Sequence, residues 1–458
     1  MLEHLERQTK LTANQWKIFV AAMIGDMLDF FDFYLIGFVL AFIIGGWHLT
    51  YGQSGFILLA SGIGAPIGSL FWGWMADRIG RRKVMILTVL NFSLATGAMA
   101  MTPTNGWLYL SICRFFVGVG VTGLFAVDIA IVQEFVPASK RGWVTGVTTS
   151  ILPIGTLLGA AAGTWLEPAV GWRGLFVVGL LPAALTLLIR SWVPESPVWL
   201  IAKGRVREAR ESLAWALQVD PETIQLPAVA AKEPTVRWKE LLQYKRSLIV
   251  SCLGGIGQTG TIGLTLWLTT LLVLVLKITP TEASFLVIWF GLMGIFGRLI
   301  CAWLSDAAGR RPAMVFGCTM AAASVSAAGY FSDVYIGGVS VFYVMILVQG
   351  MFGSGHYAVA GPYMAEVWPT RLRASGLGVG YGVGNLGKFI GPAGLAIIAG
   401  SSNMISPKAT LDALIPSMNY FAFWYLLAAA VVWFIGIETR GRTFADIDAS
   451  LKPVRAVK

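Results

Sequence analysis

The chain contains so many long apolar stretches that a lipid bilayer is the environment that suits it. Of its 458 residues, 56% are hydrophobic and 13% are charged. A helix of about 20 apolar residues crosses the roughly 30 Å of hydrocarbon in a bilayer, because it rises about 1.5 Å per residue. The sequence therefore predicts an all-α membrane protein with twelve transmembrane helices, at residues 17–44, 53–75, 84–102, 107–132, 142–165, 171–193, 247–276, 282–304, 313–332, 338–363, 374–399 and 418–437.

Two motifs occur twice, at nearly the same spacing. Residues 73–83 (GWMADRIGRRK) resemble residues 302–312 (AWLSDAAGRRP), which lie 229 positions later. Residues 134–137 (EFVP) resemble residues 366–369 (EVWP) at an offset of 232, and an arginine follows seven residues after each glutamate. Two repeats at nearly the same spacing predict a duplicated protein with two pseudo-symmetric six-helix bundles.

The positive charges indicate which side of the membrane each loop occupies. If the N-terminus lies in the cytoplasm, 27 of the 34 lysines and arginines fall in cytoplasmic segments and three fall in outer loops. The positive-inside rule then places both termini in the cytoplasm, and we expect a monomer in the cell inner (plasma) membrane, surrounded by lipid. The net charge of +10 reflects this topology, so nucleic acid is not an expected partner. The predicted domains are an N-terminal bundle at 1–193, a cytoplasmic linker with amphipathic helices at 194–246, a C-terminal bundle at 247–437 and a cytoplasmic tail at 438–458.

The sequence lacks the residue patterns of catalytic and metal sites. Its four cysteines lie in predicted helices without the spacing of a metal site or of a disulfide framework. No combination of nucleophile and base and no phosphate-binding loop stands out, because the glycine-rich stretches lie inside apolar helices. We therefore expect neither an enzyme nor a bound cofactor or metal. The cysteines are Cys113, Cys252, Cys301 and Cys318.

The first predicted helix carries three acids, Asp26, Asp29 and Asp32, inside an apolar segment. Each costs about 2.5–3.5 kcal/mol on insertion scales if it faces lipid. Steps of three residues place the acids about 60° apart on one broad helix face. We therefore expect them to line an interior path and to take part in proton coupling. An alternative is that one or two of them pair with polar neighbours and hold helices together.

Depth counting brings cations to the level of the third acid. At about 1.5 Å per residue, Asp32, Arg114 and Lys388 all lie about 20–22 Å from the cytoplasmic face. A carboxylate withdrawn from water takes up a proton more readily, and a nearby cation opposes this, so an anion coupled to protons could bind in this layer. Arg114 could instead be a fixed partner of Asp32, and Lys388 could anchor packing. The residues predicted to bind substrate are Arg114, Lys388, Gln258, Thr259, Asn385 and Tyr381.

The repeated charged motifs predict a gate at the cytoplasmic ends of the helices. In the first copy, Gly73 would allow two helices to approach closely and Gly80 would form the reversing turn. Charge pairs at a wet surface are each worth little, so they can latch one conformation and release another. The residues assigned to this gate are Asp77, Arg78, Arg81, Arg82, Glu134, Arg141, Glu195, Asp306, Arg310, Arg311, Glu366, Arg373, Glu438 and Asp128.

The motif at 73–83 resembles the loop signature of the major facilitator superfamily, and four further segments support the resemblance. They are Arg114 to Gly120, Glu134 to Gly142, Pro194 to Pro197 and the tail from Glu438 to Asp448, which resembles that of sugar-porter-like members. The acids of the first helix resemble an element of bacterial aromatic-acid and sialate proton symporters, although Phe30 stands where those usually have glycine. The resemblance implies that Asp32 and Arg114 take part in proton coupling.

Together, the motifs and the buried charges predict a secondary transporter that works by alternating access. The favoured function is proton-coupled uptake of a small organic acid, aromatic carboxylates first, with the organic anion and protons as its partners. A neutral sugar or polyol carrier is the alternative, which Lys388 and Arg114 disfavour. An exporter and a membrane sensor that has lost transport are the remaining possibilities.

Overall fold

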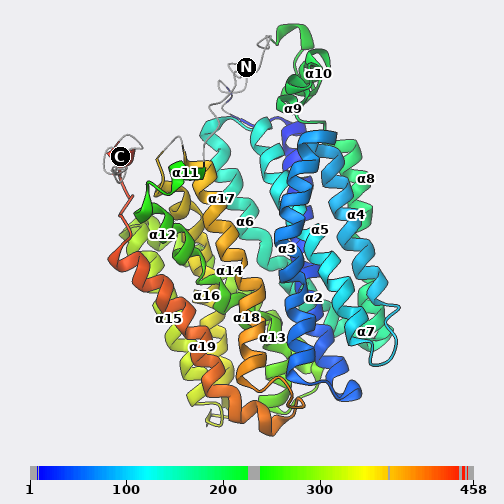
Figure 1. The fold of residues 1–458 in the computed structure, drawn as a ribbon, viewed down its shortest axis with the longest axis vertical. Helices are drawn as coiled ribbons and strands as arrows, with labels where there is room; N and C mark the ends of the chain where they lie inside the picture. The colour runs from blue at the N-terminus through cyan, green and yellow to red at the C-terminus, as the bar shows by residue number, and fades with distance from the viewer. Residues whose placement is uncertain are drawn as a thin grey trace. The chain divides into compact units, whose positions relative to one another are not determined.

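The structure, a computed structural model, describes residues 8, 10–224, 238–369, 372–442, 446–448 and 451. For some of these residues only the backbone is described; they are 125, 126, 129, 138, 139, 141–143, 145, 146, 149, 150, 190, 238, 239 and 374. The described residues form α-helices joined by short loops, with one short β-hairpin (Figure 1).

A long helix lies over each of the first five predicted spans, and the sixth is divided in two. The division follows from Pro182, which occupies the first turn of the second piece, where a missing N–H costs nothing. The elements are α2 (Ala13–Trp47), α3 (Tyr51–Ile79), α4 (Arg81–Met99), α5 (Trp107–Phe135), α6 (Ala138–Ala161), the π-helical turn η1 (Ala162–Leu166), α7 (Glu167–Val178) and α8 (Pro182–Trp192).

Short helices occupy the segment between the halves. The apolar side of α10 (Val206–Leu217) is buried through Ala209, Leu213 and Leu217, as an amphipathic pattern requires. The helix that precedes α10 begins at Pro197, and the side chain of Ser196 caps it by accepting a hydrogen bond from the Trp199 N–H. The other elements are α9 (Pro197–Ala202), the 3₁₀ turn η2 (Pro221–Thr223) and α11 (Trp238–Leu241).

The second half repeats the pattern, with two of its spans divided. Its last helix begins at Pro407, so the expected start at 418 is wrong; Ser406 caps the helix and Pro407 favours its first turn. The elements are α12 (Lys245–Gly255), α13 (Gln258–Leu276), α14 (Pro280–Ala308), α15 (Arg310–Tyr330), β1 (Tyr335–Ile336), β2 (Val339–Ser340), α16 (Val341–Glu366), α17 (Arg373–Asn385), α18 (Gly387–Ile398) and α19 (Pro407–Phe434). In the hairpin Tyr335 pairs with Ser340.

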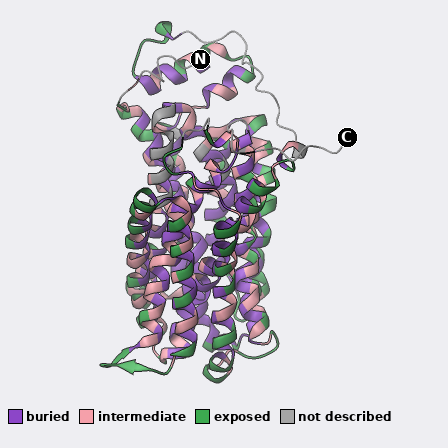
Figure 2. Cartoon of the chain, turned by 90° about the vertical axis from the view of Figure 1, so that its left-hand side faces the viewer, coloured by how far each residue is buried: buried purple, intermediate pink, exposed green. Residues whose placement is uncertain are grey.

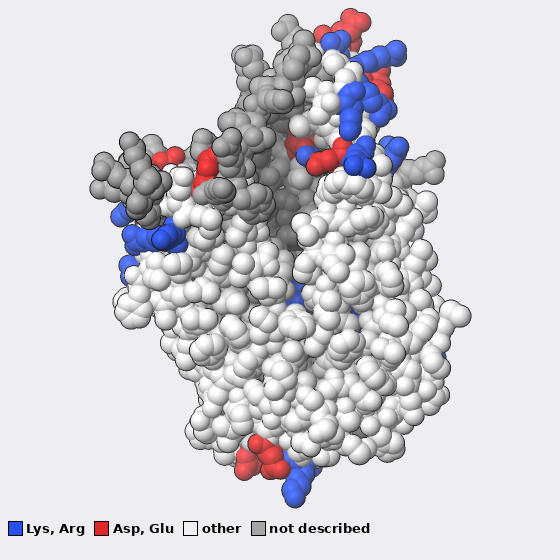
Figure 3. Space-filling model, in the orientation of Figure 1, with Lys and Arg blue, Asp and Glu red and all other residues white. Residues whose placement is uncertain are grey.

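The outward sides of the helices are apolar, as contact with lipid requires. Eight of the described helical stretches are long and apolar enough to cross a membrane. Large side chains such as Leu70, Leu187 and Phe434 are 77%, 68% and 80% exposed. Figure 2 shows exposed residues along the outer sides of the helices and buried ones toward their interior. On the face drawn in Figure 3, charged side chains gather mostly at the helix ends and leave a broad uncharged band.

The chain forms two compact units, whose limits cut through three long helices. The second part of α2 and the first part of α3 belong with the C-terminal helices. Unit 1 comprises Met1–Phe33, Ile63–Gly155 and Arg173–Pro234, and unit 2 comprises Tyr34–Gly62, Thr156–Trp172 and Thr235–Lys458.

Within unit 2, the loop between α2 and α3 pairs with the loop between α18 and α19. Main-chain hydrogen bonds of 2.9–3.1 Å join residues 49–52 to residues 401–405. Thr50 and Met404 form an antiparallel bridge at the centre of this pairing. The contact is therefore made by backbone groups, as in a small β-sheet.

Candidate functional site

The three acids of α2 are buried inside unit 1. Asp26, Asp29 and Asp32 are 0%, 2% and 0% exposed, so none of them faces lipid. The Thr96 hydroxyl on α4 donates to Asp32 Oδ2 over 3.3 Å. Asp29 interacts electrostatically with both of the other acids. The acids thus form one buried row along the helix.

Arg114 on α5 contacts the main chain of α2 at the residue that carries the third acid. Its Nη1 donates to the Asp32 carbonyl oxygen over 3.1 Å, and its Nη2 donates to the Phe33 carbonyl oxygen over 2.9 Å. The guanidinium also lies 5.6 Å from the centre of the Phe33 ring. The structure therefore brings Asp32 and Arg114 together, and it gives Arg114 a second task in holding the backbone of α2.

The first acid of the row meets a fourth acid. Asp26 lies near Asp128 on α5 and interacts with it electrostatically, and both residues are fully buried. The sequence predicts Asp128 in the cytoplasmic gate, whereas the structure places it beside the first acid of α2.

The polar residues predicted in unit 2 lie where two helices are interrupted. One helix breaks between Gly255 and Gln258, and the other breaks between Asn385 and Gly387. The breaks meet, because the Gln258 amide lies against Gly384 and the Thr259 hydroxyl lies against Gly387. Lys388 is half-buried in the first turn of α18, and Asn385 and Tyr381 are half-buried in α17. Broken helices that carry polar groups are common at the substrate sites of transporters.

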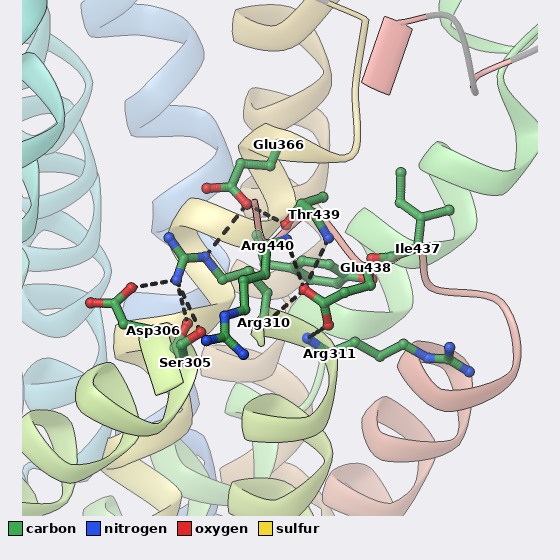
Figure 4. A network of polar contacts seen from close by, with 10 residues as sticks. Ser305, Asp306, Arg310, Arg311, Glu366, Ile437, Glu438, Thr439 and Arg440 are labelled. Carbon is green, nitrogen blue, oxygen red and sulfur yellow. Dashed lines mark hydrogen bonds and ion pairs between the residues drawn. The ribbon is translucent and has the colours of Figure 1, made fainter. Parts of the chain in front are cut away.

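One charged network occupies the ends of α14, α15 and α16 in unit 2 (Figure 4). The Arg310 guanidinium bonds to Asp306 Oδ1 over 2.5 Å and lies 3.7 Å from Glu366 Oε2. The Thr439 hydroxyl donates to the same Glu366 carboxylate. The network therefore connects three helix ends to the chain segment after α19.

Glu438 closes this network at the start of α15. Its two carboxylate oxygens accept hydrogen bonds from the backbone N–H groups of Arg310 and Arg311, over 3.0 and 3.1 Å. A carboxylate at this place satisfies otherwise unpaired donors and interacts favourably with the helix dipole. Gly309 makes the turn with a φ of 113°.

Unit 1 contains the same arrangement. Arg81 forms an ion pair with Glu134, and the Ser196 hydroxyl donates to that glutamate. Glu195 accepts a hydrogen bond of 3.1 Å from the Arg82 backbone N–H at the start of α4. The motifs that are repeated in the sequence therefore make the same kinds of contact in both units. Sequence reasoning missed the hydroxyl partners Ser196 and Thr439, although each follows a gate glutamate directly.

Other predicted gate residues make different contacts. Arg78 is exposed and lies 3.9 Å from the centre of the Trp74 ring. The backbone oxygen of Asp77 accepts a hydrogen bond from the Trp199 indole over 3.0 Å. Arg373 donates to the Ala365 carbonyl oxygen over 3.2 Å. The side chain of Arg141 lies outside the described residues.

The two glycines singled out in the first motif differ in structure. A methyl group at Gly80 would meet the Glu195 carboxylate, and Gly80 has a φ of 105°, which L-residues rarely adopt. The expectation that Gly73 allows close helix packing is wrong: among the described residues, no heavy atom lies within 4 Å of a methyl group placed there.

We expect Gly80→Ala to lower the stability of the protein by about 1–3 kcal/mol, because alanine must adopt a strained backbone and displace Glu195. The measurement is thermal unfolding in detergent. Gly73→Ala is the matched control, since it adds the same methyl group in the same motif without a clash. Equal unfolding temperatures for the two variants would contradict the role of Gly80.

Broken helices with polar side chains inside a membrane bundle are features of a secondary transporter. Residues 17–451 match the family described as sugar (and other) transporter, and the chain belongs to that family. The family lies in the major facilitator superfamily, which confirms the predicted superfamily, the twelve-helix fold and the absence of enzyme chemistry. The protein is a multi-pass membrane transporter.

Several curated relatives are similar over most of their length. The niacin transporter NiaP of Acinetobacter baylyi is 30% identical, over 93% of this chain and 94% of that protein. The cis,cis-muconate transport protein and the benzoate transport protein of the same organism are each 25% identical, over 87% and 84% of this chain and 91% and 83% of the relatives.

A solved structure is similar in fold. The xylose transporter XylE from E. coli, in a partially occluded inward open conformation, has a TM-score of 0.73 and 19% identity, over 94% of this chain and 100% of that one. At this identity the likeness establishes the fold alone.

Proposed function

We propose that the protein takes up a small organic acid anion together with protons by alternating access, with aromatic carboxylates as preferred substrates. The observation that carries the proposal is the buried acid row of α2, in which Arg114 holds the backbone at Asp32. Buried ionisable groups in a membrane protein are costly, so they are retained chiefly for ion or proton pathways. The relatives support the substrate class, because niacin, benzoate and muconate are all carboxylic acids or their anions.

Buried cations favour an anionic substrate over a neutral one. Arg114 and Arg298 are 0% and 7% exposed, and Lys388 is half-buried. A carboxylate supplies charge-assisted hydrogen bonds to such cations, whereas a neutral sugar does not. The same reasoning makes Gln258, Thr259, Asn385 and Tyr381 candidates for the substrate site, because they line or flank the helix breaks.

The acid row supplies the proton pathway in this proposal. Asp32 is the acid that exchanges protons with each cycle, and Asp29 links it electrostatically to Asp26. Binding of a proton to the row removes a negative charge from the interior and so favours entry of the substrate anion. We place the protein in the inner membrane as a monomer with both termini in the cytoplasm, following its charge distribution.

Transport into proteoliposomes tests the proposal. We expect labelled benzoate and nicotinate to accumulate when the outside is more acidic than the lumen, and xylose to show no such accumulation. Collapse of the pH gradient with a protonophore should reduce uptake to equilibration. Accumulation of xylose in place of the acids would support the neutral-sugar alternative and contradict the proposal.

We further propose that the two charged networks form the cytoplasmic gate. Glu366→Gln removes the charge that attracts Arg310, and Glu134→Gln is the matched change at Arg81 in unit 1. Each variant should slow substrate exchange severalfold and leave equilibrium affinity nearly unchanged, because the network acts on the populations of states and touches no ligand. The measurement pairs counterflow rates with ligand binding. A large loss of affinity at a normal exchange rate would contradict a gating role.

A further inference from the structure

A buried arginine in α14 has no part in the sites predicted from the sequence. Arg298 is 7% exposed and lies ten residues before the end of its helix at Ala308, which corresponds to about 15 Å along the axis. A guanidinium at this depth is expensive in a membrane protein, and such residues commonly mark substrate or ion pathways. Its surroundings in unit 2 indicate what it can bind.

Three tyrosines, each from a different helix, lie near this guanidinium. It lies 5.6 Å from the centre of the Tyr357 ring, and it interacts electrostatically with Tyr34, Tyr357 and Tyr381. Tyr34 belongs to the part of α2 in unit 2, and the other two tyrosines belong to α16 and α17. The Arg298 Nε donates to the Ser354 hydroxyl over 3.1 Å, which fixes the orientation of the guanidinium plane.

The three elements place these groups at one depth. Tyr357 lies nine residues before the end of α16, and Tyr381 lies eight residues after the start of α17. At about 1.5 Å per residue, the two tyrosines lie about 12–14 Å from those helix termini, close to the distance of Arg298 from the end of α14. Tyr381 also lies one helical turn before Asn385, so the cluster continues toward the two helix breaks.

The cluster has the chemistry of a receptor for an aromatic acid. A guanidinium carries four N–H donors on its terminal nitrogens, in a planar fork that matches the two oxygens of a carboxylate. Tyr357 and Tyr381 are half-buried although they lie inside their helices, so part of each residue remains accessible. Tyrosine rings offer apolar faces for a second ring and hydroxyl groups for a polar substituent.

We propose, on the basis of the proposed function, that Arg298 binds the carboxylate of the transported acid while the rings of Tyr357 and Tyr381 contact its aromatic ring. Arg298 then determines the preference for an acid over its neutral amide. The competing explanation is that Arg298 only ties α14 to α16 by its contact with the Tyr357 ring.

Equilibrium binding to the purified full-length protein separates these explanations, with benzoate and benzamide, and nicotinate and nicotinamide, as probes. The wild type should prefer each acid to its amide. Arg298→Gln should weaken binding of the acids about 10–100-fold and leave binding of the amides nearly unchanged, as expected for loss of a bidentate charged contact. Ser354→Ala is the control: it removes the hydrogen bond to Nε but retains the charge, so the preference for acids should persist.

The outcomes distinguish this inference from the proposed function. If the wild type prefers the acids and Arg298→Gln keeps that preference, Arg298 is structural and only the inference is overturned. If the wild type binds acids and amides equally, or binds neither, the proposed function itself fails. Should Arg298→Gln not fold, Arg298→Lys decides the matter, because lysine keeps the charge without the planar fork. It should lower the ratio of acid to amide affinity severalfold, and an unchanged ratio would overturn the inference.

Discussion

Asp32→Asn is expected to abolish accumulation of substrate driven by a pH gradient and to leave exchange across equilibrated membranes largely intact. Asparagine preserves the shape of the side chain and can keep a hydrogen bond with Thr96, but it cannot take up or release a proton. The hydrogen bonds from Arg114 go to backbone oxygens at 32 and 33, so the substitution leaves those acceptors in place. The measurement compares gradient-driven uptake with counterflow in the same proteoliposomes.

Two matched variants sharpen the test of Asp32. Thr96→Ala removes the hydrogen bond to the acid but keeps the acid, so accumulation should persist at a reduced rate. Asp29→Asn changes the neighbouring acid of the same row and reports whether Asp29 is the titrating group instead. Unchanged gradient-driven uptake by Asp32→Asn would remove Asp32 from the mechanism.

Lys388→Gln is expected to weaken binding of acids by about 1.5–3 kcal/mol, or roughly 10–100-fold, while leaving expression and folding nearly intact. The residue is half-buried in the first turn of α18, beside the interrupted segment between Asn385 and Gly387. A cation at this depth can bind the carboxylate of the proposed substrate through a charge-assisted contact. The measurement is binding of an acid and of its neutral amide to the purified variant.

A different result is expected for Lys388→Gln if Lys388 does not bind the substrate. If an acid of the chain were the partner of Lys388, the variant would fold poorly or lose proton coupling while its affinity for acids stayed the same. Lys388→Arg is the matched control, because it retains the charge and should retain most of the preference for acids. Equal affinity of the wild type for acid and amide would contradict the anion-carrier interpretation as a whole.

The helices could be predicted well from the sequence because apolar length alone determines them. The interruptions at Pro182, at Gly257 and at Leu386 were harder to predict, since the same apolar run continues on both sides of each break. The start of α19 was placed eleven residues too late because the polar side chains near Asp412 hid a helix that Ser406 had already capped. Capping residues therefore carry information that a hydropathy window loses.

The sequence predicted the buried acids of the candidate site well, but it predicted the contacts between the site residues less well. Steps of three residues showed that Asp26, Asp29 and Asp32 share a face, and their burial agrees with an interior position. The meeting of Asp26 with Asp128 could not be read from spacing, because it depends on how two helices are rotated against each other. Arg298 was overlooked for a similar reason: its tyrosine neighbours come from three helices far apart in the sequence.

The pairing of residues 49–52 with residues 401–405 uses backbone groups, whereas the gate networks use ionised side chains. Dissolved salt screens exposed charges over about 10 Å at 0.1 M ionic strength and has little effect on hydrogen bonds between amides. Raising the ionic strength should therefore weaken the contact of Arg310 with Asp306, whose side chain is 78% exposed, and leave the paired loops closed. The conformational equilibrium of this transporter would then depend on the salt content of one compartment, the one that bathes the charged helix ends.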